Sequence, residues 1–595
     1  MKKILYLFFF AQLTFLYAQD EYVATAGNIK ITKQEFLERY ELSPVIGKEN
    51  IRNETGAKYS LLYSIIAEKL WALEAEKNKL DTSKSVYAPL SIIEKLYIKD
   101  ALYKKEITDK ITITEKEIND AVKKYVRKLK VKYIFSAEEK DINNKYYLLQ
   151  KGYSFDSLYI KNIENDNTKE IEFGILEEEV EDEIFKLTVG GITKPIFWND
   201  GYYIFYLESE SRQLFIDTKG KNNTIDIIKK KITERKADIL RKNCTAKLLK
   251  NVRAKSDKKI IDLLAQNTFE LLKNKTASQD SNGIYYNLTE KDGLYLEIYL
   301  KEYLDNEFIK INNKSINLEK FIDDLTFFGL RFDSKDLRTI TIKLNQKVKQ
   351  FIEDELLFQE GVKQGLQHTP EVKRQVKMWK DNYLFQVFRS KINYENFNSF
   401  KDSLISQKED INYYNKIYNY LVINFVDISQ AEDIFNNIEN KNIEELKKYY
   451  DTFNSIFIEE KNENENNITL EIKDALLTLK PNEVYGPINL NTGYKIIKLL
   501  ATKEDTVKTK ITGTKQIEEL AQNMAGEKIA KTTAIWAKKY GITINDEYLK
   551  SLKVTRINSY IIKMFGFGGR IGAVPITPPF YKWVEEYKKL KEDSL

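Results

Sequence analysis

Histidine and cysteine are almost absent from this sequence of 595 residues, which contains one of each, His368 and Cys244. A single cysteine excludes a disulfide within the chain, and the two counts together exclude a zinc site of several cysteines and histidines. Any mechanism that needs two histidines is excluded as well. His368 follows the predicted helix stop Gly365, so we interpret it as a loop residue, and Cys244 as a small side chain of a helix.

A strong net charge is also missing. The chain has 95 Lys and Arg against 89 Asp and Glu, a formal charge of +6 over its whole length, which gives no indication of a nucleic-acid partner. No glycine-rich phosphate loop of the Walker form is present, so no cofactor is expected. The acidic run at 177–183 lacks the spacing of a calcium loop, and no metal is expected.

Apolar residues, in contrast, are plentiful. Hydrophobic residues make up 42% of the chain and aromatic residues 12%, with 38 Tyr and 31 Phe. This composition predicts packed cores rather than a disordered chain, and the length predicts several domains.

The first 19 residues have the pattern of a cleaved signal peptide. Lys2 and Lys3 precede an apolar run at 4–17, which ends at the small residue Ala18. A retained membrane anchor is the alternative, but the run is shorter than the ~20 residues that usually span a bilayer. No cysteine follows the run, so a lipid-anchored protein is not expected. We therefore expect an exported, periplasmic protein.

A long internal repeat is predicted from four anchors that recur in the same order. The offsets between the two copies are 285, 286, 288 and 292 positions. The anchor pairs are Phe36 and Phe321, Leu70 and Leu356, Leu158 and Leu446, and Pro195 and Pro487. Agreement of all four by chance is improbable, so the chain is predicted to contain two copies of one unit.

Within each copy the pattern changes from helical to mixed. Apolar stripes at helical spacing come first, and in the second copy Gly365 ends one predicted helix and Pro370 begins the next, which predicts a helical hairpin. Alternating strands follow at 129–135 and 420–426, and each copy closes with a hairpin of two strands. The predicted fold class is therefore α+β and multidomain.

The closing segments at 187–208 and 479–500, "LTVGGITKPIFWNDGYYIFYLE" and "LKPNEVYGPINLNTGYKIIKLL", resemble the end of the parvulin-type peptidyl-prolyl isomerase domain. The segment at 23–44, "VATAGNIKITKQEFLERYELSP", resembles the chaperone segments of SurA-type periplasmic foldases. The resemblance implies helical chaperone segments that alternate with two parvulin-like domains.

The resemblance and the repeat together give the expected domain boundaries. These are a signal peptide at 1–19, a helical chaperone segment at 20–127, a parvulin-like domain at 128–212, a helical connector at 213–300, a second helical segment at 301–415, a second parvulin-like domain at 416–504, a helical segment at 505–563 and a tail at 564–595.

In the family, a pair of histidines on the first and last strands shapes the site where an X-Pro bond is twisted. The equivalent positions here are Tyr133 and Tyr203 in the first copy, and Tyr420 and Lys495 in the second. Because none is histidine, isomerase activity is predicted to be weak or lost in both domains. The alternative is an active isomerase in which tyrosines replace the histidines, since a twisted amide is also bound by shape and desolvation.

The tail is rich in glycine, proline and aromatic residues. Its aromatic residues are Phe565, Phe567, Phe580, Tyr581 and Trp583. Rings of this kind are expected to pack either on a partner in the envelope machinery or on the helical core of the protein itself.

The predicted function is that of a foldase-type chaperone, which binds unfolded or extended polypeptides such as outer-membrane or secreted proteins. The alternative from another class is a structural subunit of an envelope assembly or secretion complex.

Overall fold

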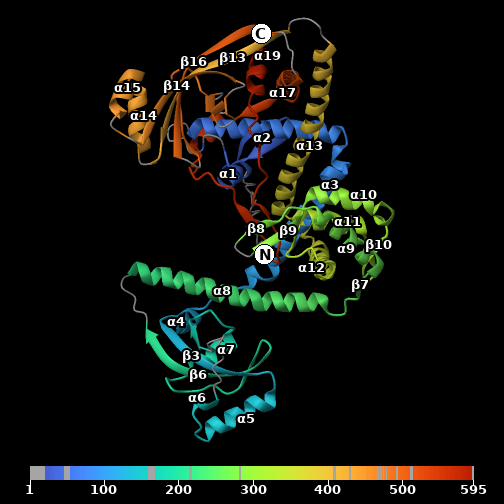
Figure 1. Ribbon diagram of the computed structural model, residues 1–595, viewed down its shortest axis with the longest axis vertical. Helices are drawn as coiled ribbons and strands as arrows, with labels where there is room; N and C mark the ends of the chain where they lie inside the picture. The colour runs from blue at the N-terminus through green and yellow to red at the C-terminus, as the bar shows by residue number, and fades with distance from the viewer. Residues whose placement is uncertain are drawn as a thin grey trace, which may run out of the picture.

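The computed structural model (Figure 1) describes residues 21–592, apart from 46–47, 49–53, 159–167, 213–217, 281–282, 407–410, 428–429, 452, 454, 466–467, 470–471, 474, 477–478, 491–492 and 510–513. The predicted signal peptide at 1–19 lies outside this range. Among the described residues, no helix combines the length and apolarity needed to cross a bilayer.

The chain begins with a β-hairpin and four helices. They are β1 (Tyr22–Ala26), β2 (Ile29–Thr32), α1 (Lys33–Leu42), α2 (Glu54–Lys77), α3 (Lys84–Glu106) and α4 (Glu115–Tyr125). The hairpin turns at Gly27, whose φ of +60° favours glycine. Helix α1 starts where the Thr32 hydroxyl accepts a hydrogen bond from the Glu35 amide, at 3.1 Å.

A four-stranded sheet with the order β4-β3-β6-β5 follows. Its elements are β3 (Arg127–Ser136), α5 (Glu139–Gln150), α6 (Phe155–Leu158), β4 (Thr168–Ile171), α7 (Glu178–Phe185), β5 (Ile196–Trp198) and β6 (Gly201–Arg212). Alternation along β3 places Leu129 and Val131 on one face with α7, and Ile134 on the other face with α5. We call this the first sheet.

The middle of the chain contains a second hairpin-and-helix unit. Its elements are α8 (Thr218–Leu249), β7 (Ala254–Ser256), α9 (Lys258–Lys273), β8 (Ser278–Asp280), β9 (Gly283–Leu288), α10 (Glu290–Tyr299), β10 (Glu307–Ile311), β11 (Lys314–Asn317), α11 (Leu318–Phe328), β12 (Leu330–Phe332), α12 (Leu337–Lys363) and α13 (Pro370–Ser406). The expected helical connector at 213–300 is therefore only partly helical, because β7, β8 and β9 interrupt it.

A second four-stranded sheet has the order β14-β13-β16-β15. Its elements are β13 (Ile411–Phe425), α14 (Ala431–Asn440), α15 (Ile443–Tyr450), β14 (Ile456–Asn464), β15 (Val484–Leu490) and β16 (Gly493–Thr509). We call this the second sheet. The chain ends with α17 (Thr514–Tyr540), β17 (Ile542–Ile544), α18 (Asp546–Ser551), the short strands β18 (Ile562–Met564) and β19 (Arg570–Gly572), and α19 (Trp583–Glu592).

The two β-hairpins are completed by strands from far away in the sequence. Strand β17 pairs with β1, so Thr25 lies opposite Thr543. In the same way, β7 pairs with β10, so Lys310 lies opposite Lys255. The hairpin β1–β2 therefore receives its third strand from the segment that follows the second sheet, and the hairpin β10–β11 receives its third strand from the segment that follows the first sheet.

The helices are distributed in the same way. Helix α2 packs on α13 and α17, while α12 packs on α3, α8 and α9. The helices on either side of Gly365 meet at a tight turn, where Gly365 has φ of +75° and α13 begins at Pro370. The predicted helical hairpin does not close, however, because α13 packs on α2, α3 and α17 rather than along α12.

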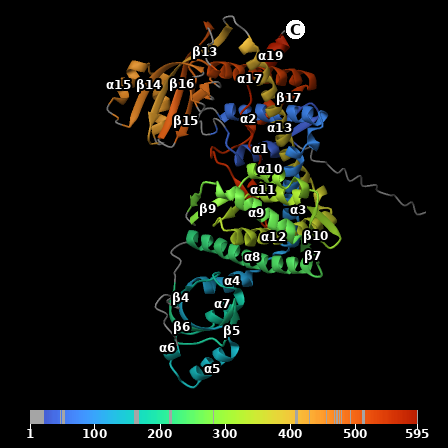
Figure 2. The same ribbon diagram turned by 45° about the vertical axis from the view of Figure 1, so that its right-hand side comes forward.

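The two four-stranded sheets lie at opposite ends of the molecule, with the intertwined helices between them (Figures 1 and 2). The first sheet lies at the lower end, separated from the middle by the long helix α8. Two large apolar cores fill the middle, one around α2 and α13 and one around α9, α11 and α12. The fold is thus α+β and multidomain.

Candidate functional site

One face of the first sheet carries a group of aromatic side chains where β3, β5 and β6 meet. We call this group the aromatic cluster; its members are Tyr133, Phe135, Trp198, Tyr203 and Phe205. The register explains the grouping, because Phe135 lies opposite Tyr203 and Tyr133 opposite Phe205 on adjacent strands. Cross-strand aromatic neighbours of this kind stabilise a sheet and form a continuous apolar surface.

The cluster is partly open to solvent. Phe205 is buried at its base with 1% exposure, whereas Phe135 at the end of β3 is 40% exposed. Tyr133, Trp198 and Tyr203 are half-buried between them. Together these rings present an apolar surface at one end of the sheet, next to the core beneath α7.

Tyr133 and Tyr203, the two positions predicted from the family, lie side by side in this cluster. Their ring centroids are 5.7 Å apart with an interplanar angle of 50°. Tyr133 and Tyr203 are expected as a possible hydrogen-bonding pair, but the hydroxyl of Tyr203 donates to Asp200 Oδ1 at 3.4 Å, and the two tyrosines meet through their rings. Burial, followed by the nearby Asp200 carboxylate, raises the pKa of Tyr203 above its ordinary value, so the phenol is neutral at physiological pH.

Two further features shape the cluster. The ammonium of Lys169 lies 5.5 Å from the centre of the Tyr133 ring and 5.9 Å from that of Trp198, a distance at which a cation is attracted to the ring face. A side chain at Gly201 would place its Cβ 2.4 Å from the Phe135 ring, so only glycine lets this ring lie across the start of β6.

The second sheet has no comparable aromatic group at the equivalent positions. Its register places Val422 opposite Ile497, as Tyr133 is opposite Phe205, so Val422 rather than Tyr420 occupies the equivalent of Tyr133. The assignment of Tyr420 is thus shifted by two residues along the strand. Lys495 lies opposite Asn424 and is half-buried.

Tyr420 has a structural environment instead. It is 0% exposed in the core of the second sheet, and its hydroxyl donates to Glu463 at 2.6 Å. Burial and this hydrogen bond raise the pKa of Tyr420. The side chain therefore holds β13 to β14 and is not available to a ligand.

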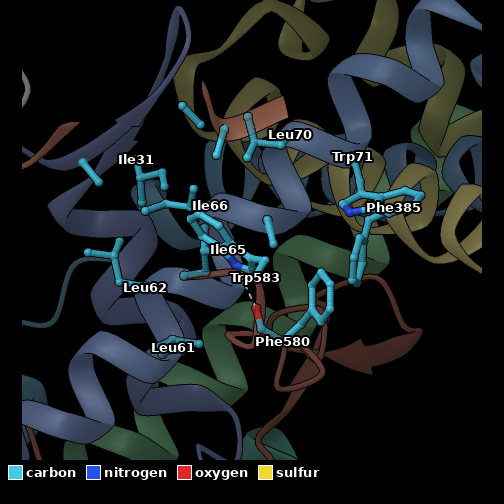
Figure 3. Close-up of a cluster of buried hydrophobic side chains, with 14 of the residues drawn as sticks. Ile31, Leu61, Leu62, Ile65, Ile66, Leu70, Trp71, Phe385, Phe580 and Trp583 are labelled. Carbon is cyan, nitrogen blue, oxygen red and sulfur yellow. Dashed lines mark hydrogen bonds between the residues drawn. The ribbon is translucent and has the colours of Figure 1, made fainter. Parts of the chain in front are cut away.

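The aromatic residues of the tail pack inside the protein itself. Trp583 is 0% exposed, and its indole donates to the Phe580 carbonyl at 3.1 Å and to the Tyr63 carbonyl at 3.3 Å. Figure 3 shows Trp583 and Phe580 among Leu61, Leu62 and Ile65 of α2.

The remaining tail rings lie near α3 or beside Trp583. Phe565 meets Tyr97 and Phe567 meets Tyr103, both edge-on, with centroids 5.3 and 5.2 Å apart. Tyr581 is half-buried. Of the two roles expected for this tail, packing on the helical core of the protein is the one that occupies the rings in this structure.

His368 and Cys244 lie far from the aromatic cluster in the sequence. His368 is exposed in a 3₁₀ turn, Leu366–His368, and Cys244 is half-buried on α8, where burial raises the pKa of its thiol. The described residues contain no group of three metal-ligating side chains.

Sequence reasoning identified Tyr133 and Tyr203 but missed Phe135, Trp198 and Phe205. A signal was present, because residues two apart on a strand share a face. Tyr133 and Phe135, and Tyr203 and Phe205, have this spacing.

The chain is similar to known foldase proteins over part of its length. No family model matches the chain. It is similar to the foldase protein PrsA of Caldanaerobacter subterraneus subsp. tengcongensis, with 27% identity over 275 residues, which cover 39% of this chain and 89% of the relative. It is also similar to the foldase protein PrsA of a Geobacillus species, with 26% identity over 220 residues, 34% of this chain and 76% of the relative. The resemblance to parvulin-type foldases is thereby confirmed.

Two solved structures match the chain at low TM-scores. A peptidylprolyl isomerase, PrsA, of Bacillus anthracis superposes with a TM-score of 0.19 and 19% identity, over 30% of this chain and 89% of that one. A structure of SurA-like chaperones of Campylobacter jejuni matches with a TM-score of 0.15 and 18% identity, over 41% of this chain and 96% of that one.

Proposed function

We propose that this protein is an exported foldase-type chaperone that binds unfolded or extended polypeptides, and that the aromatic cluster of the first sheet is a contact surface for them. The observation that carries the proposal is the partly exposed group of five rings, which includes Tyr133 and Tyr203 at the positions that the resemblance makes equivalent to the family's histidine pair. Large flat rings bury much apolar area with little loss of side-chain freedom, and they accept many sequences.

The same cluster argues for weak or lost isomerase activity. An X-Pro bond rotates over a barrier of ~18–20 kcal/mol, and an isomerase must bind the twisted state better than either planar state. With tyrosine at both histidine positions, and the Tyr203 hydroxyl directed to Asp200, the site favours binding of apolar chain over stabilisation of one strained amide.

An active isomerase remains the second candidate because the Tyr133 and Tyr203 rings are in contact. In that case the two tyrosines would shape the floor of the site in place of the histidines. Weak activity that is lost in Tyr203→Phe would support this candidate over the first.

The two sheets are proposed to have different roles. The first presents rings, whereas the second has Val422, Asn424 and Lys495 at the matching positions. We assign the second sheet a structural or spacer role. A subunit of an envelope assembly or secretion complex remains the alternative class, and it would bind one partner at fixed stoichiometry rather than many unfolded chains.

We further propose that the chain arose by internal duplication. Strands β1 and β10 begin 285 positions apart, α3 and α13 286 positions apart, and β7 and β17 288 positions apart. The two four-stranded sheets share one strand order, and the three-stranded sheets β2-β1-β17 and β11-β10-β7 do as well. These regularities support two copies of one unit, here called the first half (residues 20–273) and the second half (residues 307–552).

The test combines aggregation suppression with a proline-isomerisation assay on the mature chain. Phe135→Ala/Trp198→Ala removes two rings from the cluster, and we expect affinity for an unfolded client to fall about tenfold, equivalent to about 1.4 kcal/mol. The matched control, Tyr394→Ala/Phe457→Ala, removes rings that are 68% and 61% exposed elsewhere. Equal client binding by both variants would overturn the proposal, and isomerisation well above the uncatalysed rate would favour the second candidate.

A further inference from the structure

Each half of the chain packs a helix of the other half, and two buried ion pairs join these exchanged helices. Helix α2 of the first half packs on α13 of the second, while α12 of the second half packs on α3 of the first. Lys69 Nζ of α2 lies 2.9 Å from Asp381 Oδ2 of α13, with side chains 1% and 2% exposed. Lys95 Nζ of α3 lies 3.1 Å from Glu355 Oε2 of α12, with side chains 12% and 2% exposed.

These two ion pairs occupy equivalent positions with their charges reversed. Lys69 and Glu355 are 286 positions apart, and so are Lys95 and Asp381. The same offset relates the ends of α2 and α12 and the starts of α3 and α13. In each half, therefore, the two positions carry charges of one sign: lysines at 69 and 95, and acids at 355 and 381.

This arrangement has a consequence for wrong assembly. If the first half of one molecule took α3 from the first half of another, Lys69 would face Lys95 inside the core. If two second halves paired, Glu355 would face Asp381. Two like charges in a buried site, each deprived of the counter-ion that the other half supplies, cost far more than a lost surface pair.

Other charges around the two pairs do not remove this discrimination. Lys69 also lies 2.6 Å from Glu35, and Asp381 lies 3.2 Å from Lys377, so each member of this pair has a second partner from its own half. Glu355 likewise has Lys314 at 2.6 Å. Self-pairing would leave these partners from the same half in place, but it would replace the partner from the other half by a like charge.

A neighbouring ion pair disfavours self-pairing of the second halves only. Lys99 of α3 pairs with Asp354 of α12, and the position equivalent to Lys99 in the second half is Phe385. Self-paired second halves would thus leave Asp354 facing an aromatic ring. Self-paired first halves would place Lys99 near Glu68, which already binds Arg39 at 2.8 Å.

We infer that the reversed ion pairs Lys69–Asp381 and Lys95–Glu355 select the partner of each exchanged helix, so that each half accepts helices from the other half and rejects those of its own kind. Each exchanged helix docks on a second, non-identical copy of the unit, and this copy is normally the other half of the same chain. This inference rests on the proposed duplication and is independent of client binding.

The test uses the full chain, unfolded in urea and refolded over a dilution series, with oligomers measured by size-exclusion chromatography and light scattering. The double variant is Lys95→Glu/Glu355→Lys, made with Lys314→Gln because Lys314 lies 2.6 Å from Glu355. Its native pair is retained with the sign reversed, but both kinds of self-pairing become attractive. We expect a several-fold larger fraction of exchanged oligomers than in the wild type.

The control reverses both pairs, as Lys69→Glu/Lys95→Glu/Glu355→Lys/Asp381→Lys, with Glu35→Gln, Lys314→Gln and Lys377→Gln to accommodate the new charges beside these residues. Native pairs are again retained, while self-pairing brings like charges together once more, so the oligomer fraction is expected to return to the wild-type level. An equal oligomer fraction in wild type, double variant and control would overturn the inference.

A further variant covers the case in which the double reversal fails to refold. Lys95→Gln/Glu355→Gln removes the like charges without adding an attraction, and a smaller rise in oligomers is expected; no rise would count against the inference. Client binding of the monomeric fraction is measured in parallel. Because the substituted positions lie outside the aromatic cluster, failure of the proposed function would appear there and not in the oligomer fraction.

Discussion

Replacing Trp583 with alanine tests whether the C-terminal tail holds the two ends of the chain together. The indole is fully buried, donates to two carbonyls and meets the Tyr63 ring edge-on, with centroids 6.1 Å apart. The adjacent Phe580 amide donates to the Ser64 hydroxyl at 2.9 Å. Helix α19 is therefore fixed to α2 both by apolar area and by hydrogen bonds.

The expected cost follows from these contacts. Truncation of a buried aromatic side chain to alanine costs about 3–5 kcal/mol, because the transfer free energy is lost and a cavity remains. At about 1.4 kcal/mol for each factor of ten, the protection of α2 amides against hydrogen exchange should fall by roughly two to three and a half orders of magnitude.

The assay is native-state hydrogen exchange with peptide-level readout of α2 and of β1 and β17. The control Met564→Ala lies in the same tail but is 70% exposed, and we expect its effect to stay within about 0.5 kcal/mol. A loss below about 1 kcal/mol in Trp583→Ala, or a loss equal to that of the control, would refute the reasoning that the tail is part of the core.

Two further predictions concern helix packing and pH. A Cβ at Gly361 would lie 2.5 Å from Ile98 Cγ2, so Gly361→Ala should separate α12 from α3 and destabilise the protein by about 1–3 kcal/mol in urea unfolding. The control is Gly526→Ala at an exposed helical position with open space around it, where we expect a gain in stability of up to about 1 kcal/mol. If Gly526→Ala were the more destabilising of the two, the packing of α12 on α3 would be contradicted. Burial raises the pKa of Asp323 to about 6 from 3.8, although Lys84 opposes the shift. The stability that this group contributes is thus present below pH 3.8 and lost as the pH rises through 6. We therefore expect Asp323→Asn to stabilise the protein by about 2 kcal/mol at pH 8, after allowance for solvent screening, and by little at pH 3.5. An equal gain in stability at both pH values would count against this prediction.

Local elements were predictable because their determinants are local. The segment from Val23 gave two short strands and a helix, and the structure has β1, β2 and α1 there. Gly365 and Pro370 marked the end of one helix and the start of the next, as glycine tolerates positive φ and proline suits the first helical turn. The alternating strands at 129–135 and 420–426 lie within β3 and β13.

The exchange between the halves could not be predicted in this way. Periodicity shows that α13 has an apolar stripe, but α2 and α12 both present surfaces suited to receive it. The choice is made by contacts such as Lys69 with Asp381, across more than 300 positions of sequence. A pattern read along one segment contains no information about which of two similar partners it meets.

The candidate site was predicted in part for a related reason. Tyr133 and Tyr203 were found by resemblance to a motif, whereas Phe135 and Trp198 join the cluster through cross-strand register. The register of both sheets is interrupted at equivalent places, Lys130/Val131 in β3 and Asn419/Tyr420 in β13. The pairing of Val422 with Ile497 across to β16 places Val422 at the equivalent of Tyr133, and alternation along β13 alone does not contain this pairing.

The pairing of β17 with β1 has a consequence for the timing of folding. Thr25 and Thr543, whose hydroxyls lie 2.7 Å apart, are separated by 518 positions. At a synthesis rate of about 5–20 residues per second, roughly 25–100 s pass between their emergence. For that interval the first hairpin is a two-stranded ribbon in which β1 as well as β2 has an open edge, so the chain would itself depend on protection until β17 is made.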